Sequence, residues 1–340
     1  MKIGLRTIKT GIAVGIALLV VQLFEIESVV FITIAALIGM QPTLSDSWQK
    51  GANRLYGTIV GAAFGVLLAL ILPSHFLLAS LGVVVLIMIM NRLNIPEGIT
   101  ISSVVFISIF MNSDPDRTIY AYALSRLTDT VLGISIALLV NYYILPPKYD
   151  RKAMLEMRKD MTRIMVCQNR MLGMLLKQQN IAQEDIEEEM QAILLEIEES
   201  KKLAEMQEKE ERHNVYGTIL FEEIDLVLHL TTDMYQHLQN LFGLVCSGVS
   251  AKSLMPVNND LLRLYGQMKK VEEKMVAGEV KEAQVFNELM VVVKQIKHRI
   301  KSEEVYKQLE TEEVVKLMVM VYNIGEILSK MDVITTKRHA

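Results

Sequence analysis

Six apolar runs separated by short polar connectors fill the first 145 residues of the chain. They are Gly11–Phe24, Val29–Met40, Leu55–Leu72, Phe76–Met90, Ile99–Met111 and Leu127–Leu145. Several are shorter than the ~20 residues that cross a bilayer, so we expect them to extend into polar flanks or to lie in a locally thin region. The connectors Glu25–Ser28 and Pro73–His75 are short. The pattern therefore predicts six short transmembrane helices in three antiparallel hairpins.

From Asp150 onward the pattern changes to almost continuous amphipathic helix. Methionines recur at three- and four-residue steps in its first helix, which is more typical of a packed core than of a binding surface. Pro146 and Pro147 mark the join. The predicted fold class is all-α, with a transmembrane domain over residues 1–147 and a cytoplasmic helical bundle over residues 148–340.

The chain is organised around residues 33–72, where two apolar runs flank a polar connector. The connector holds Pro42, Asp46, Trp48, Lys50 and Arg54. The second run carries Gly57, Gly61 and Gly65, whose four-residue spacing places them on one helical face. This spacing predicts close packing of another helix, in the same subunit or in a second one.

A weak internal repeat links two of these runs at an offset of 72 residues. Four identical pairs carry it: Arg54/Arg126, Leu55/Leu127, Thr58/Thr130 and Gly61/Gly133. With six spans the two copies would run in opposite directions, which is a common feature of transporters. Arginines at or within spans indicate function, with Arg126 the stronger candidate. The alternative is that Arg54 reaches the headgroups while Arg126 pairs with Asp129 one turn away.

Charge indicates the orientation. Residues 1–150 hold nine Lys/Arg and eight Asp/Glu, so the net charge of −4 arises in the second half, and this mild acidity argues against nucleic-acid binding. Basic connectors stay on the cytoplasmic side. Most basic residues fall on the side of the N-terminus, Arg117 and Arg126 being exceptions. We therefore expect a multi-pass protein of the cell membrane with a retained first span and both termini cytoplasmic.

The stretch ITIAALIGMQPTLSDSWQKGANRLYGTIVGA, residues 32–62, resembles the signature of the fusaric-acid-resistance and aromatic acid exporter superfamily. Residues 126–146 resemble its closing span, and plant aluminium-activated malate transporters share the pattern. The acidic helical tail is most similar to that of the bacterial aromatic acid exporters. The matching residues are Gln41, Pro42, Thr43, Arg54, Gly57, Thr58, Gly61, Arg126 and Gly133. One departure is the absence of Trp from the start of the second span.

The resemblance implies a homodimer of six-span subunits in the lipid bilayer that passes small organic anions along a pathway lined in part by basic residues. An anion crossing hydrocarbon needs a countercharge, and a guanidinium also forms a fork of hydrogen bonds to a carboxylate. Arg126 and Arg54 would supply this, with Thr58 and Thr130 as hydroxyl donors unless each bonds to its own helix. We expect Arg126→Ala to abolish efflux while leaving membrane abundance intact.

One cluster in the second half could hold a metal. Glu222, Asp225, His229, Asp233 and His237 lie on one helical face. A single helix supplies too few ligands, so this face is better explained as polar and partly solvated, with His229 and His237 as weak candidates. A Glu-x-x-His spacing occurs at Glu210 and His213. The two distant cysteines, Cys167 and Cys246, indicate packing in a reducing compartment.

No phosphate loop, dinucleotide fingerprint or hydrolase elbow appears in the sequence. We therefore expect no cofactor and no enzymatic activity, with titratable residues near the membrane, among them Glu25, Glu27, Glu97 and Asp129, available for gradient coupling. The leading interpretation is export or channel-like efflux of small organic anions such as aromatic carboxylates. The alternative is a membrane-anchored helical sensor that dimerises through the glycine face. Metalloenzyme chemistry in the bundle is a third.

Overall fold

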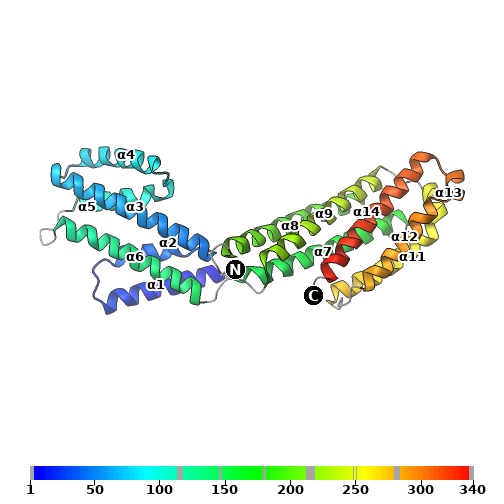
Figure 1. Ribbon diagram of the computed structural model, residues 1–340, viewed down its shortest axis with the longest axis horizontal. Coiled ribbons are helices and arrows are strands. Elements are labelled where there is room, and N and C mark those ends of the chain that lie inside the picture. Colours follow the sequence, from blue (N-terminus) through cyan, green and yellow to red (C-terminus); the bar gives the residue numbers. More distant parts are fainter. Residues whose placement is uncertain are drawn as a thin grey trace. The chain divides into compact units, whose positions relative to one another are not determined.

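The computed structural model describes residues 4–112, 118–144, 148–177, 179, 181–211, 219–247, 249, 251–278 and 284–336. These residues form helices and no strand, which confirms the all-α fold class. The chain divides into two compact units, one of residues 1–147 with 209–215 and one of residues 148–208 with 216–340. Figure 1 shows both units. Arg117, Pro146, Pro147 and His213 lie outside the described residues.

Every apolar run of the first unit is a helix. The elements are α1 (Leu5–Leu23), α2 (Val29–Gly39), α3 (Leu44–Ile71), α4 (Phe76–Arg92), η1 (Pro96–Gly98), α5 (Ile99–Phe110) and α6 (Ile119–Tyr143). Helices α1, α3 and α6 are long and apolar enough to cross a membrane, whereas α2, α4 and α5 are apolar but shorter. The expectation that spans extend into polar flanks is confirmed for α3 and α6.

The predicted polar connector between α2 and α3 is mostly helix. Asp46, Trp48, Lys50 and Arg54 lie within α3, so treating them as a connector was wrong. The reason is the N-cap: the Thr43 hydroxyl oxygen accepts a hydrogen bond from the Asp46 backbone N–H at 2.9 Å, which starts the helix early. Arg54 therefore belongs to the body of a 28-residue helix.

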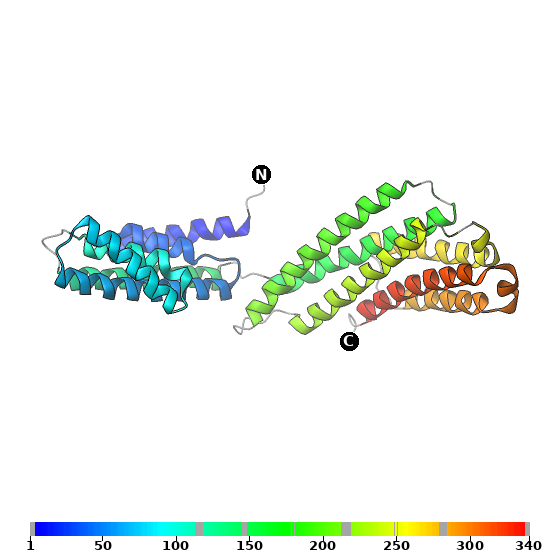
Figure 2. The same cartoon turned by 90° about the horizontal axis from the view of Figure 1, so that it is seen from above.

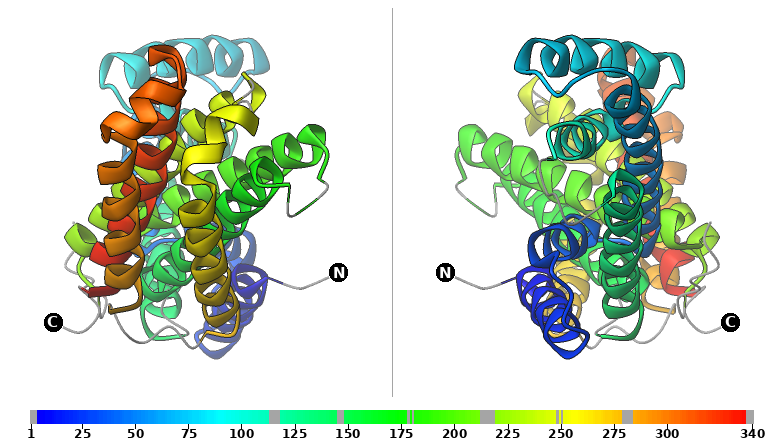
Figure 3. Two further views of the ribbon diagram at one scale, coloured as in Figure 1. Left: turned by 90° about the vertical axis from the view of Figure 1, so that its right-hand side faces the viewer. Right: turned by 90° about the vertical axis from the view of Figure 1, so that its left-hand side faces the viewer.

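Helix α3 packs mainly against α5 and α6, and α2 packs against α6. Helix α1 lies against α2, and α4 lies against α5. Figures 1 and 3 show α1 and α4 on opposite sides of this unit. The first unit is thus two packed groups, one of α1, α2 and α6 and one of α3, α4 and α5, that meet where α3 packs against α6.

The second unit is a bundle whose helices close a ring. Its elements are α7 (Tyr149–Leu175), α8 (Gln183–Glu211), α9 (Phe221–Cys246), α10 (Ala251–Leu254), η2 (Met255–Val257), α11 (Asn258–Val276), α12 (Gln284–Ile300), α13 (Glu303–Gln308) and α14 (Thr311–Thr336). Helix α7 packs against α9 and α11, α9 against α14, and α12 against both α14 and α11 (Figure 2). Met157, Met161 and Met165 are buried, which confirms the core interpretation of the methionine stripe.

Candidate functional site

The glycine face of α3 packs against α5 of the same chain. A Cβ on Gly57 would lie 2.7 Å from the Gly98 carbonyl oxygen, and one on Gly61 would collide with the Ser102 backbone. At Gly65 the nearest atom is the Ile109 Cβ at 3.1 Å. The helix that approaches these glycines therefore belongs to the same chain. This face is therefore covered, which removes it as the dimerisation surface of the sensor alternative.

The repeat at offset 72 has a structural counterpart. Gly133 on α6 lies against the backbone of α2, where a Cβ would come within 2.5 Å of the Ile32 carbonyl oxygen. Its repeat mate Gly61 meets α5 in the same way, so α2 and α5 occupy equivalent places. Between the two glycine contacts, the Thr58 and Thr130 hydroxyl oxygens lie 3.2 Å apart. Equivalent positions that touch each other indicate a pseudo-two-fold axis between α3 and α6.

Arg126 is buried, and partners surround it. Its Nη2 lies 3.1 Å from the Asp129 carboxylate and donates to the Ser28 hydroxyl at 2.5 Å. Its guanidinium carbon also lies 3.9 Å from the centre of the Phe31 ring and 4.8 Å from that of Tyr122. The ion pair between Arg126 and Asp129, which the sequence analysis gave as the alternative to a transport role, is therefore present.

Arg54 is equally buried, with 5% of the residue exposed, but its surroundings differ. Among the residues that the structure describes, none forms an ion pair with Arg54, and its Nε has no hydrogen-bond acceptor. The positions equivalent to Asp129 and Tyr122 lie 72 residues earlier on α3. The positions equivalent to Ser28 and Phe31 lie 70 residues later, on η1 and α5. This offset follows from Ile32 and Ser102, which contact Gly133 and Gly61 respectively. Around Arg54 these four places hold Gly57, Lys50, Gly98 and Ile101. No side chain among them can accept a hydrogen bond from the guanidinium or stack on it as an aromatic ring.

A cavity of about 280 Å³ opens beside Arg54. Apolar side chains from α2 and α5 form most of its lining, with Lys50, Asn53 and Glu97 at one end. The apolar residues are Phe31, Ile34, Ile38, Ile101 and Val104. A buried cation next to an apolar cavity fits a ligand that has an anionic group and a hydrocarbon body.

The polar end of this cavity is held by a small network. Glu97 on η1 accepts hydrogen bonds from Lys50 Nζ at 3.1 Å and from Asn53 Nδ2 at 3.0 Å, and both donors lie on α3. The Lys50 charge is therefore already compensated. Of the two cations that line the cavity, Arg54 is the one without a counterion in the described structure.

The two threonines of the repeat bond to their own helices. Thr58 Oγ1 donates to the Arg54 carbonyl and Thr130 Oγ1 to the Arg126 carbonyl, each at 2.9 Å. Their hydrogens are thus used within α3 and α6, as the sequence alternative proposed. The two hydroxyl groups lie where the two repeats contact each other.

The Gln41–Pro42–Thr43 motif has a structural role. Asn141 on α6 donates from Nδ2 to the backbone carbonyls of Gln41 at 3.1 Å and Thr43 at 3.2 Å, and to Ser47 Oγ at 2.9 Å. Lys9 on α1 in turn donates to Asn141 Oδ1 at 2.9 Å. The motif therefore ties the α2–α3 turn to α6 and α1.

The histidines proposed as weak metal ligands do not converge. His237 Nδ1 lies 2.8 Å from Asn323 Oδ1 on α14, whereas His229 is exposed and 3.6 Å from Asp225 on its own helix. In the part of the chain that is described, no three His, Cys, Asp or Glu side chains gather as a metal site. Nothing in this geometry fits the metalloenzyme alternative.

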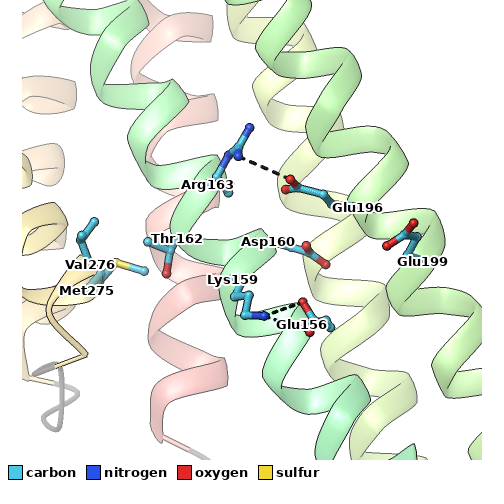
Figure 4. Close-up of a pocket in the computed structure, with 9 residues that line it drawn as sticks. All are labelled: Glu156, Lys159, Asp160, Thr162, Arg163, Glu196, Glu199, Met275 and Val276. Carbon is cyan, nitrogen blue, oxygen red and sulfur yellow. Dashed lines mark hydrogen bonds and ion pairs between the residues drawn. The ribbon is translucent and has the colours of Figure 1, made fainter. Parts of the chain in front are cut away.

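The bundle has a cavity of about 600 Å³ between α7 and α8, shown in Figure 4. Its cations are paired: Arg163 with Glu196 at 3.4 Å and Lys159 with Glu156 at 2.9 Å. Buried Asp160 accepts a hydrogen bond from Ser200 Oγ at 2.6 Å, and burial raises its pKa to about 6. With its cations neutralised and acidic groups in excess, this cavity is a poor site for an anion.

Comparison with known proteins gives a match in the first half of the chain. Residues 1–144 match the family model described as Aromatic acid exporter family member 1. The resemblance expected from the sequence is confirmed for residues 1–144, which contain Arg54, Arg126 and the cavity between α2 and α5. The match ends before the helical bundle.

Curated relatives match a stretch of similar length. UPF0421 protein YgaE of Bacillus subtilis (strain 168) is 32% identical over 152 residues, which are 45% of this chain and 42% of that protein. A UPF0421 protein of Staphylococcus epidermidis (strain ATCC 12228 / FDA PCI 1200) is 34% identical over 148 residues, which are 43% of this chain and 44% of that protein. The similarity thus spans less than half the length of each relative.

Sequence reasoning missed two residues of the site. Asn141 interrupts an otherwise apolar run, and an isolated polar residue inside a span is a signal that could have found it. Phe31 gives no such signal, because an aromatic residue in an apolar run has the same pattern whether it faces lipid or a cavity.

Proposed function

We propose that the chain forms a membrane pathway for export or channel-like efflux of small organic anions, above all aromatic carboxylates, and that Arg54 binds their carboxylate. The observation that carries this proposal is the buried Arg54, which has no anionic partner in the described structure and faces an apolar cavity. The sequence favoured Arg126, but its guanidinium is already paired. The geometry therefore supports Arg54 as the recognition residue.

Electrostatics supports an anion at Arg54. A charge taken out of water without a partner is costly, and a carboxylate that enters the cavity would offset this cost. Arg also offers parallel N–H donors that match the two oxygens of a carboxylate. The apolar lining around Phe31, Ile34 and Val104 would receive the hydrocarbon part of the same molecule. An aromatic carboxylate meets both requirements.

The repeat architecture supports a transport role. In transporters built from inverted repeats, short apolar segments in corresponding positions of the two halves point to the substrate site. Helices α2 and α5 are such a pair, with 11 and 12 residues, and both line the cavity. The match of residues 1–144 to an aromatic acid exporter family adds support of a different kind. Six spans with both termini cytoplasmic, as the Lys/Arg distribution favours, are part of this proposal.

The test is counterflow of radiolabelled benzoate in proteoliposomes that contain the purified full chain. We expect saturable counterflow by the wild type and a loss of about 10- to 100-fold in apparent affinity in Arg54→Ala, the range for a charge-assisted hydrogen bond. Arg54→Lys keeps the charge but not the fork, so it should retain part of the binding. Arg92→Ala, at the exposed end of α4, is the matched control and should behave like the wild type.

Unchanged counterflow in Arg54→Ala would place the anion site elsewhere. Absence of counterflow in the wild type, across a panel of benzoates and dicarboxylates, would favour the sensor alternative.

A further inference from the structure

We propose that Arg126 is a second carboxylate site and that the chain's own Asp129 occupies it in the present structure. The inference rests on the proposed function of Arg54, because it assigns the same ligand chemistry to the equivalent residue of the other repeat. It treats the Arg126–Asp129 pair as an occupied site rather than as a fixed structural contact.

The geometry around Arg126 is that of a filled anion site. A carboxylate lies 3.1 Å from Nη2, and the Ser28 hydroxyl accepts from the same nitrogen. Arg126 Nε nevertheless lacks a hydrogen-bond acceptor among the described residues. Asp129 thus engages the guanidinium through one edge only, and a second donor stays available for an incoming carboxylate.

The other repeat shows the same site without this occupant. Gly57 stands where Asp129 stands in the other copy, and Arg54 has no counterion in the described structure. The two arginines occupy equivalent backbone positions. Each lies one turn from a threonine of the Thr58–Thr130 contact. Of the four places that differ between them, only the one held by Asp129 carries an anionic group, and the chain itself supplies that carboxylate.

A single side chain connects the two sites. Phe31 lines the cavity beside Arg54, and its ring centre lies 3.9 Å from the guanidinium carbon of Arg126. An anion that moves past Phe31 from Arg54 therefore meets Arg126 next, where it competes with Asp129. Through this contact Arg126 would be a second anion-binding position on the same pathway.

Benzoate binding to the full chain in nanodiscs, measured by isothermal titration calorimetry, tests the inference. Asp129→Asn removes the charge of the occupant while keeping its shape. We expect the number of benzoates per chain to rise from about one in the wild type to about two in Asp129→Asn. The variant R54A/D129N should keep about one, at Arg126, and R126Q/D129N should keep about one, at Arg54.

Stoichiometry separates this inference from a purely structural ion pair, which would change stability but create no new site. If Asp129→Asn binds no more benzoate than the wild type, or if its second benzoate persists in R126Q/D129N, the inference is overturned. A wild type that binds no benzoate would contradict the proposed function alone, since a site gained in Asp129→Asn and lost in R126Q/D129N would still support Arg126.

Folding of Asp129→Asn is itself informative. Recovery of this variant only when benzoate is present during purification supports the inference, because the added carboxylate then replaces Asp129. Failure to recover it with or without benzoate, while R126Q/D129N is recovered, contradicts the inference, because Arg126 would then accept no carboxylate other than its own neighbour.

Discussion

Arg54 and Arg126 begin from the same sequence position in two copies of one repeat, and both are buried in long apolar helices. Arg126 has a carboxylate, a hydroxyl and two aromatic rings around it, whereas the equivalent places near Arg54 hold residues that satisfy none of its donors. Arg54 also borders a cavity. Identical residues in a repeat thus acquire different roles through their neighbours, here most of all through Asp129 and Gly57.

The largest expected effect comes from removing Arg126 alone from the Arg126–Asp129 ion pair. Arg126→Ala removes the cation of a buried ion pair and should lower the free energy of unfolding by about 3–5 kcal/mol. This revises the sequence expectation of unchanged membrane abundance. Arg54→Ala removes an unpaired buried charge, so its stability should be unchanged or higher. Thermal melting in detergent measures both, and equal losses in the two variants would mean that Arg54 is held by a partner after all.

The bundle contains a second buried carboxylate, Asp160, which can be compared with Asp129. Asp160 in the bundle has Ser200 as a hydrogen-bond donor, and its pKa is raised from 3.8 to about 6, mainly by burial. The unfolded chain loses this proton first, so stability should fall as pH rises from about 4 to about 6 and then level off. Asp160→Asn should remove this slope and add at most about 3 kcal/mol at neutral pH, whereas Asp129→Asn should destabilise.

Melting curves of the full chain at pH 4.5 and pH 7.5 measure both effects of the Asp160 variant. A variant that melts with the wild-type pH dependence would show that another group sets the slope.

Glycine substitutions test whether the two repeats pack equivalently. Gly61→Ala and Gly133→Ala each force a Cβ against a neighbouring backbone and should cost about 1–3 kcal/mol in similar amounts. Gly15→Ala in α1 is the control, because nothing lies near that position and alanine should stabilise the helix by about 0.5–1 kcal/mol. Melting temperatures that drop for only one of the two glycine variants would show that just one copy depends on close approach.

The smallest effect is expected at the contact between the repeats. Thr58→Val and Thr130→Val each remove one hydroxyl whose hydrogen already bonds within its own helix, so each should change the free energy of unfolding by no more than about 1 kcal/mol. A double-mutant cycle measures the coupling between the two hydroxyls. Strong coupling would indicate that their 3.2 Å contact carries energy of its own.

Much of the fold was predictable from the sequence because it depends on periodic patterns. The six apolar runs, the amphipathic bundle and the close-packed glycines all became helices or contacts of the expected kind. The start of α3 was missed because the Thr43 side chain determines where the helix begins. A hydrophobicity pattern does not reveal an N-cap.

The candidate site was only half predictable. The sequence singled out both arginines and foresaw the Asp129 pair, since the spacing of three residues on one helix is a local property. It could not foresee that Arg54 lacks a counterion in the described structure. Gly57 is visible three residues along the same helix, but Gly98 on η1 and Ile101 on α5 also surround Arg54, and these have no fixed sequence distance from α3.

The contact between Thr58 and Thr130 joins equivalent positions, as a two-fold axis does in a dimer of identical chains. Identical chains must carry the same residue on both sides of such an axis, so a carboxylate beside one arginine would stand beside the other as well. Placing both copies in one polypeptide lifts this constraint. A single codon can then give one arginine a resident counterion and leave the other open, a direction built into the molecule that no symmetric assembly of its halves could encode.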